Sequence, residues 1–221
     1  MSTSSSRFDI ADAFGVGWRT FVANVVPMAL YALAVFAVSV IVNLILGQPT
    51  GFFASLFSTI VMFVIGQLMA IGWLRIALDA IDGRPVSADR IRESFGVLVP
   101  YLIGAIIFGI AVSIGMVLLI VPGIIVILVF GFYGWIIVDG VRKDAIEALR
   151  RSAEITRGER LHLFVFGILL MLFNILGLIV LVVGVLVTSA ISVLAVAHVY
   201  RQLEASAAGA RRPAPEEAPV S

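Results

Sequence analysis

The sequence predicts an all-α integral membrane protein with six transmembrane helices in three hairpins, each preceded by an amphipathic helix at the cytoplasmic membrane surface. Three blocks without any Asp, Glu, Lys or Arg carry this prediction, namely residues 20–74, 94–138 and 161–200. One membrane-spanning helix needs about 20 apolar residues, so each block accommodates two. The spans are expected to be helices because lipid offers the backbone no hydrogen-bond partners and the alternating pattern of a membrane β-barrel is absent.

The composition excludes an ordinary soluble domain. Apolar residues make up 61% of the 221 residues and charged residues 13%, whereas about a quarter of the residues in a soluble domain are charged. Cysteine is absent, which excludes disulfides, thiol nucleophiles and Cys-based metal sites. The net charge of +1 gives no support to a nucleic-acid partner.

The distribution of charge predicts the orientation. Two spans per block return the chain to the side it left, so all fifteen Lys and Arg residues fall on one face of the membrane. The positive-inside rule makes this face, and with it both termini, cytoplasmic. An excess of Arg over Lys, with abundant Ala, indicates a GC-rich bacterial genome and hence the bacterial cytoplasmic (inner) membrane. The expected aromatic anchors at the inner helix ends are Trp73, Tyr133, Trp135 and Tyr200, and the expected outer connections are 47–51, Pro122 with Gly123, and 177–184.

The chain divides into three expected parts. Residues 1–7 are a disordered N-terminus, residues 8–204 form the membrane domain, and residues 205–221 are a disordered cytoplasmic tail rich in Ala and Pro. Within the membrane domain, a weak threefold repeat of surface helix and hairpin covers residues 8–80, 86–140 and 142–203.

The most charged surface helix is expected within residues 142–160, where ten of nineteen residues are charged. Asp144 is the expected N-cap of a capping box with Glu147, Glu147 is expected to pair with Arg151, and Gly158 to end the helix. We favour a helix that orients the next hairpin at the membrane surface, and a docking face for a protein partner is the alternative. Either function would use the charged face formed by Glu147, Arg150, Arg151, Glu154 and Arg157.

Two further surface helices are expected ahead of the other hairpins. Residues 8–25 contain an apolar stripe at helical spacing, and residues 87–96 are a shorter candidate. The stripe consists of Ile10, Phe14, Trp18, Phe21 and Val25.

Several short motifs carry a resemblance to a known family. They are Pro122 with Gly123, Val138 with Asp139, Glu147 to Leu149, Arg151 with Ser152, Thr156 with Gly158, and Tyr200, Arg201 and Leu203. With these motifs the chain resembles a bacterial family of small polytopic membrane proteins that includes the glycerophosphoryl diester phosphodiesterase membrane domain. The resemblance implies a membrane fold. It implies no phosphodiesterase activity, because only the membrane region is matched.

No pattern in the sequence predicts an enzyme, a metal site or a cofactor. His162 and His198 are too few for a metal site. Five carboxylates are expected at the cytoplasmic helix ends, where a metal or acid–base pair is the alternative to solvated loop charges. These carboxylates are Asp79, Asp82, Asp89, Glu93 and Asp139.

Proton-coupled transport is disfavoured because the three apolar blocks contain no Asp, Glu, Lys or Arg. Polar side chains within the spans are expected to bond neighbouring helices. Asn174 and Gln67 are the candidates for a polar intramembrane site. We therefore expect a non-catalytic accessory or scaffold protein with the lipid bilayer and a membrane-protein partner, or a second copy of the chain, as its contacts. A small facilitator or lipid-handling protein for a neutral or lipidic solute is the alternative.

Overall fold

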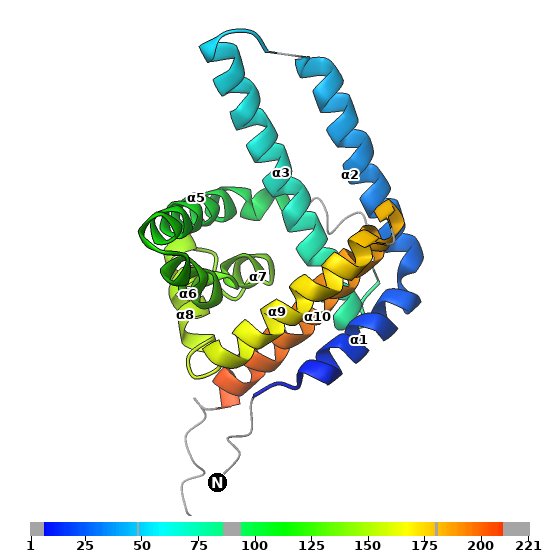
Figure 1. Cartoon of the computed structure of the whole chain (residues 1–221), viewed down its shortest axis with the longest axis vertical. Coiled ribbons are helices and arrows are strands. Elements are labelled where there is room, and N and C mark those ends of the chain that lie inside the picture. The colour runs from blue at the N-terminus through cyan, green and yellow to red at the C-terminus, as the bar shows by residue number, and fades with distance from the viewer. Residues whose placement is uncertain (1–6, 48, 86–93, 180, 210–221) are drawn as a thin grey trace, which may run out of the picture.

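The computed structural model describes residues 7–47, 49–85, 94–179 and 181–209, which are helical apart from caps and short connections (Figure 1). The helices are α1 (Ile10–Ala23), α2 (Val25–Leu46), α3 (Phe52–Ile81), α5 (Ser94–Leu118), α6 (Ile120–Phe130), α7 (Tyr133–Val138), α8 (Ala145–Ile155), α9 (Arg160–Ile179) and α10 (Leu181–Gly209).

Within the described ranges, six helical stretches are long and apolar enough to cross a membrane. This confirms the predicted all-helical membrane class. The stretches are Val25–Leu46, Phe52–Ile81, Phe95–Leu118, Ile120–Val138, Arg160–Ile179 and Gly184–Gly209. The surface helix expected at 87–96 lies largely outside the described residues. Helix α10 continues to Gly209, inside the segment expected to be the tail.

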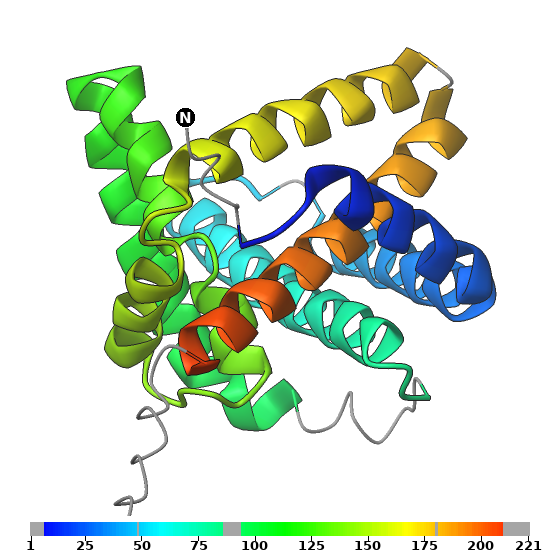
Figure 2. The same cartoon turned by 90° about the horizontal axis from the view of Figure 1, so that it is seen from below.

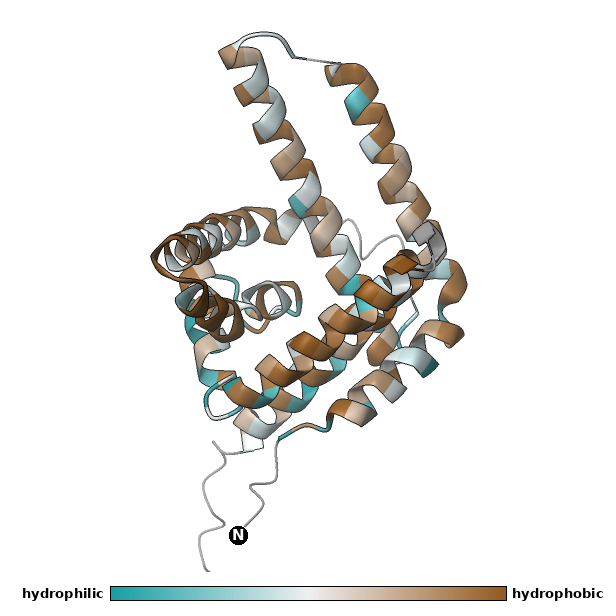
Figure 3. Cartoon of the chain, viewed as in Figure 1, coloured by the Kyte–Doolittle hydropathy of each residue, from teal (hydrophilic) through white to brown (hydrophobic). Residues whose placement is uncertain are grey.

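The apolar helices form three pairs that point in different directions from a shared base (Figures 1 and 2). The pairs are α2 with α3, α5 with α6, and α9 with α10. Hydrophilic residues gather towards the base, where α8 and the C-terminal part of α10 lie, and the outer parts of the pairs are mostly hydrophobic (Figure 3). The protein core also lies at the base, and includes Ile71, Ile76, Ile136, Ile155, Leu194, Val199 and Leu203.

Helix α1 packs closely along α10 because both helices present small residues. A Cβ atom on Gly17 would lie 2.9 Å from the carbonyl oxygen of Ile191 and 3.2 Å from the backbone nitrogen of Ala195. Ala13 is fully buried in the same face of α1. Small residues at such crossings let backbones approach each other in membrane proteins.

The second outer connection differs from its predicted position. The chain is interrupted at Leu119, which is extended with φ −169° and ψ 151°, and not at Pro122 and Gly123. Pro122 instead occupies the first turn of α6, where its missing N–H group has no intrahelical partner to lose. The first connection lies at 47–51 as predicted, and Gly47 and Gly51 have φ of 60° and 96°.

The prediction of aromatic membrane anchors is wrong for Tyr133, Trp135 and Tyr200, which are buried in the protein core. The ring of Tyr200 stacks on that of Trp135, with the centroids 6.2 Å apart, and Tyr133 packs against Tyr101 at 5.7 Å. These rings fill the space between α10, α7 and α5. Aromatic burial therefore fastens the base of the helix pairs to one another.

Candidate functional site

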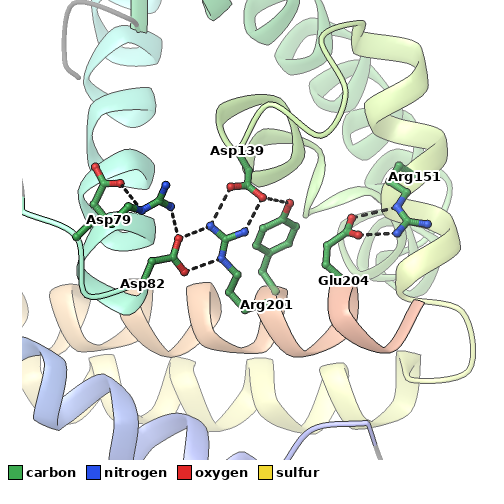
Figure 4. A network of polar contacts seen from close by, with 8 residues as sticks. Asp79, Asp82, Asp139, Arg151, Arg201 and Glu204 are labelled. Carbon is green, nitrogen blue, oxygen red and sulfur yellow. Dashed lines mark hydrogen bonds and ion pairs between the residues drawn. The ribbon is translucent and has the colours of Figure 1, made fainter. Parts of the chain in front are cut away.

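Arg201, in the C-terminal part of α10, joins two other helices through two forked ion pairs (Figure 4). Its Nε and Nη2 atoms donate to the two carboxylate oxygens of Asp82 at 3.0 and 2.6 Å. Its Nη1 and Nη2 atoms donate to those of Asp139 at 2.6 and 2.9 Å. Asp82 is the C-cap of α3 and Asp139 is the C-cap of α7. A carboxylate is unfavourable at the negative end of a helix dipole, so the guanidinium compensates two such ends at once.

Three more side chains complete this cluster. The hydroxyl group of Tyr200 donates to Asp139 at 3.1 Å. Arg84 contacts Asp82, and its Nε atom lies 3.4 Å from a carboxylate oxygen of Asp79. We call the six residues Asp79, Asp82, Arg84, Asp139, Tyr200 and Arg201 the charged hub.

The expectation that the carboxylates of this region are solvated loop charges is wrong for Asp79, which is buried, whereas Asp139 is half-buried and Asp82 is an exposed residue. Asp79 is 3% exposed, and the side chains of Asp82 and Asp139 are 24% and 14% exposed. The hollow between Asp79, Asp139 and the neighbouring arginines measures about 50 Å³, which admits water but is far below the roughly 300–1,000 Å³ of a ligand pocket. Asp89 and Glu93 lie outside the described residues.

Arg151 makes a third forked ion pair, between α8 and α10 (Figure 4). Its Nε and Nη2 atoms donate to Glu204 at 3.0 and 2.5 Å, and Nη1 donates to Glu154 at 3.2 Å. Hydrogen bonding to Glu204 raises the pKa of Arg151 above its ordinary value, against the opposing effect of burial. Arg151 is 6% exposed, so its assignment to a partner or headgroup surface is wrong. The predicted Glu147–Arg151 pair is also wrong, because Glu147 lies beside Arg142 instead, at 3.8 Å.

Helix α8 begins at the predicted cap, since the Asp144 carboxylate accepts from the backbone nitrogens of Ile146 and Glu147. The helix ends at Ile155, before Gly158, which was expected to end it. Gly158 lies in the following turn and has a φ of 92°. The buried side of α8 includes Leu149 and packs against protein, namely α7 and the neighbouring helices. The remaining residues of the predicted charged face are exposed, namely Glu147, Arg150, Glu154 and Arg157.

Ser152 of α8 bonds to the backbone at the point where the chain passes from α6 to α7. The sequence did not predict this interruption between the two helices. The Ser152 hydroxyl group donates to the carbonyl oxygen of Val129 at 2.8 Å and accepts from the backbone nitrogen of Phe132 at 3.2 Å. Helix ends leave such backbone groups without intrahelical partners. Thr156 also reaches Val129, at 3.4 Å. The two hydroxyls thus allow the apolar run Ile120–Val138 to bend without buried unsatisfied groups at this point.

Both histidines make local contacts. His198 Nε2 lies 3.0 Å from a carboxylate oxygen of Asp12, so it ties α10 to α1. His162 packs edge-on against Phe8 with ring centroids 4.8 Å apart. Across the part of the chain that the structure describes, no group of three or more metal-ligating side chains is present.

Asn174 and Gln67, the candidates for a polar intramembrane site, lie on α9 and α3. The Asn174 amide donates to the carbonyl oxygen of Leu170 and to the hydroxyl of Ser192, both at 2.8 Å. It therefore bonds α9 to α10. Gln67 is half-buried on α3. Neither residue lines the apolar groove described next.

An apolar groove runs between α2, α3 and the N-terminal part of α10. It consists of two adjoining hollows of about 520 and 470 Å³. The hydroxyl groups on its wall are already bonded within the chain, as in the 2.7 Å hydrogen bond from the Tyr31 hydroxyl to the carbonyl of Met69. The groove can therefore accept an apolar group but offers little to recognise a polar one. The residues that both hollows share are Ala32, Phe36, Trp73 and Leu186.

No known protein family, curated protein or solved structure matches the chain. The resemblance of most of the chain to the family of the phosphodiesterase membrane domain therefore stays a prediction.

Proposed function

We propose that the chain is a non-catalytic accessory or scaffold protein of the bacterial inner membrane, which binds another membrane protein or a second copy of itself through α2 and α3. Six spans in three hairpins would place the charged hub and both termini in the cytoplasm, in keeping with the positive-inside rule. Surface helices would lie beside these hairpins, with α1 and α8 as the described examples.

The observation that carries this proposal is the contrast between the base of the protein and the α2–α3 pair. Met28 is the one buried residue of α2, and the buried residues of α3 are confined to its last third, from Ile71 to Ala80. Figure 1 shows the two helices apart along most of their length. Leu44, near the outer end of α2, is 77% exposed.

The base of this pair is firmly held. The rings of Tyr31 and Trp73 stack with centroids 5.6 Å apart, and Gly72 makes room for the Tyr31 hydroxyl group. A fixed base with an unfilled outer part suits a pair that packs against helices from another chain. In lipid, such packing depends on van der Waals contact and interhelical hydrogen bonds, because apolar exposure alone gives no driving force.

Site-specific photo-crosslinking in intact cells tests the proposal. A photoreactive residue at Leu44 or Phe57, both exposed on α2 and α3, should yield the same protein adduct of defined mass. The matched positions Ile114 and Leu172, exposed on α5 and α9, should yield lipid adducts. Mass spectrometry of the adduct then separates a second copy from another protein. Lipid adducts alone at all four positions would contradict the proposal.

A lipid-handling protein is the second candidate function, and the apolar groove favours it. An acyl chain fits a groove whose wall is mostly apolar and whose hydroxyl groups are already bonded. Replacing Ala32 by Trp should fill the groove and reduce the amount of lipid that native mass spectrometry finds bound to the purified protein. The control Ala34→Trp, at an exposed position outside the groove, should leave it unchanged. Equal lipid retention in the two variants would exclude the groove as a lipid site.

A further inference from the structure

Three arginines surround a shallow hollow where α8 leads into α9. The hollow measures about 570 Å³ and is lined by Arg150, Arg157 and Arg160, with Glu154 and Leu161 also at its wall. We call it the basic hollow. Arg160 is exposed and was not part of the charged face predicted from the sequence, whereas Arg151 was predicted to belong to that face and is buried.

The basic hollow carries an excess of positive charge, because three arginines and one carboxylate, Glu154, lie at its wall. No ion pair joins Arg150, Arg157 or Arg160 to a carboxylate among the described residues, and all three are exposed. Glu154 is the carboxylate at the wall, and it already accepts from Arg151 Nη1 at 3.2 Å. In the charged hub, by contrast, Arg84 and Arg201 both contact carboxylates.

The position of the arginines adds to this excess. Arg160 is the first residue of α9 and Arg157 precedes it by three. Positive side chains are disfavoured at the N-terminal end of a helix, where the dipole is itself positive. An anion in the basic hollow would relieve this repulsion.

A stripe of exposed apolar residues leads directly to the basic hollow. Leu161, at its wall, is 77% exposed. Val165, Ile168, Leu172 and Ile175 follow along the same face of α9 at helical spacing and are also exposed. The hollow thus lies at the end of a span, where a lipid-facing surface gives way to charge.

We infer that the basic hollow binds the phosphate of an anionic phospholipid whose acyl chains lie along the exposed stripe of α9. Guanidinium groups bind phosphate through paired hydrogen bonds, and arginines beside a membrane span attract anionic lipids. This site is separate from the α2–α3 pair, so it stands or falls independently of the proposed scaffold function.

Native mass spectrometry of the full chain in detergent tests this inference with phosphatidylglycerol and phosphatidylcholine of identical acyl chains. The wild type should prefer phosphatidylglycerol. The triple variant Arg150→Gln, Arg157→Gln, Arg160→Gln should bind phosphatidylglycerol about a hundredfold more weakly, at roughly fivefold for each arginine. The control variant Arg19→Gln, Arg142→Gln, Lys143→Gln removes the same charge from other exposed positions and should retain the preference.

Two results would overturn the inference. Equal losses in the two triple variants would mean that overall charge, and not the basic hollow, selects the lipid. Complete displacement of phosphatidylglycerol by millimolar inorganic phosphate would assign the hollow to a soluble phosphate and remove the role of the apolar stripe. Because all six substituted positions are exposed, both variants should fold, and equal thermal unfolding temperatures would verify this.

Discussion

Asp82 and Asp139, which Arg201 joins, stand in the same local setting. Each ends a helix as its C-cap and is followed by a glycine in the left-handed region, with φ of 67° at Gly83 and 79° at Gly140. The chain turns away at the glycine and leaves the carboxylate at the helix end. Two helix ends of like charge can then approach each other only with a cation between them.

Replacing Arg201 should therefore destabilise the whole base. Arg201→Gln leaves Asp82 and Asp139 facing each other, and we expect a loss of about 3 kcal/mol in the free energy of unfolding. Arg201→Lys keeps the charge but loses the fork that serves both carboxylates, so its loss should be smaller. Thermal unfolding in detergent measures both. The control Arg150→Gln, at an exposed arginine, should stay within about 0.5 kcal/mol of the wild type, and an equal effect of Arg201→Gln would contradict a structural role for the hub.

At the scale of the elements, two of the contacts between helices depend on a single small or polar residue. The α1–α10 crossing depends on the absence of a side chain at Gly17, and the α6–α7 bend depends on the hydroxyl group of Ser152. For each of these two residues, a residue of the same type elsewhere in the molecule makes no such contact and serves as its control. These controls are Gly15 and Ser189.

Gly17→Ala should separate α1 from α10. Its Cβ atom would meet backbone at 2.9 Å, and such overpacking costs about 1–3 kcal/mol. Gly15→Ala lies in the same helix with nothing within 4 Å of the added Cβ atom, and should stabilise α1 by up to about 1 kcal/mol through helix propensity. Thermal unfolding of the two variants should therefore shift in opposite directions. A shift in the same direction would mean that the crossing is not tightly packed.

Ser152→Ala should loosen the bend between α6 and α7. It removes the hydroxyl group that bonds the carbonyl oxygen of Val129 and the backbone nitrogen of Phe132, and a buried backbone group left without a partner costs about 1–3 kcal/mol. Faster hydrogen exchange at the amide of Phe132 is the specific readout. Ser189→Ala removes a hydroxyl that bonds only within its own helix and should leave this amide unchanged. Unchanged exchange in Ser152→Ala would assign the bend to packing alone.

At the scale of the whole molecule, the sequence predicted the six apolar helices because charge is excluded from lipid and therefore marks the span boundaries directly. It did not predict the charged hub, since Arg201 and Asp82 are 119 positions apart and no local pattern links them. The feature of the sequence that could have indicated the charged hub is the Asp–Gly pair at the end of both α3 and α7. The bend at Gly131 was missed because it falls inside an unbroken apolar run, and Arg151 was misplaced because a helical pattern does not say which face a distant helix covers.

The arrangement of the pairs also leads to a prediction on orientation. The ends of α2 and α3 that follow each other in the chain point away from the base (Figure 1), Leu119 joins α5 to α6, and Lys143 and Arg157 flank α8. If the base is cytoplasmic, single-cysteine variants Thr50→Cys and Leu119→Cys should react with a membrane-impermeant maleimide in spheroplasts. Lys143→Cys and Arg157→Cys should react only in inverted vesicles.

The chain contains no native cysteine, so every label reports on the introduced residue. All four positions are exposed on the protein, so the protein itself shields none of them, and reaction of all four variants in detergent is the control for a thiol that lipid covers. The reverse pattern would place the charged hub outside the cytoplasm and contradict the positive-inside rule for this protein. Labelling of Thr50→Cys and Leu119→Cys from opposite sides would show that the α2–α3 and α5–α6 pairs do not enter the membrane from the same face, and the three-hairpin topology would then be wrong.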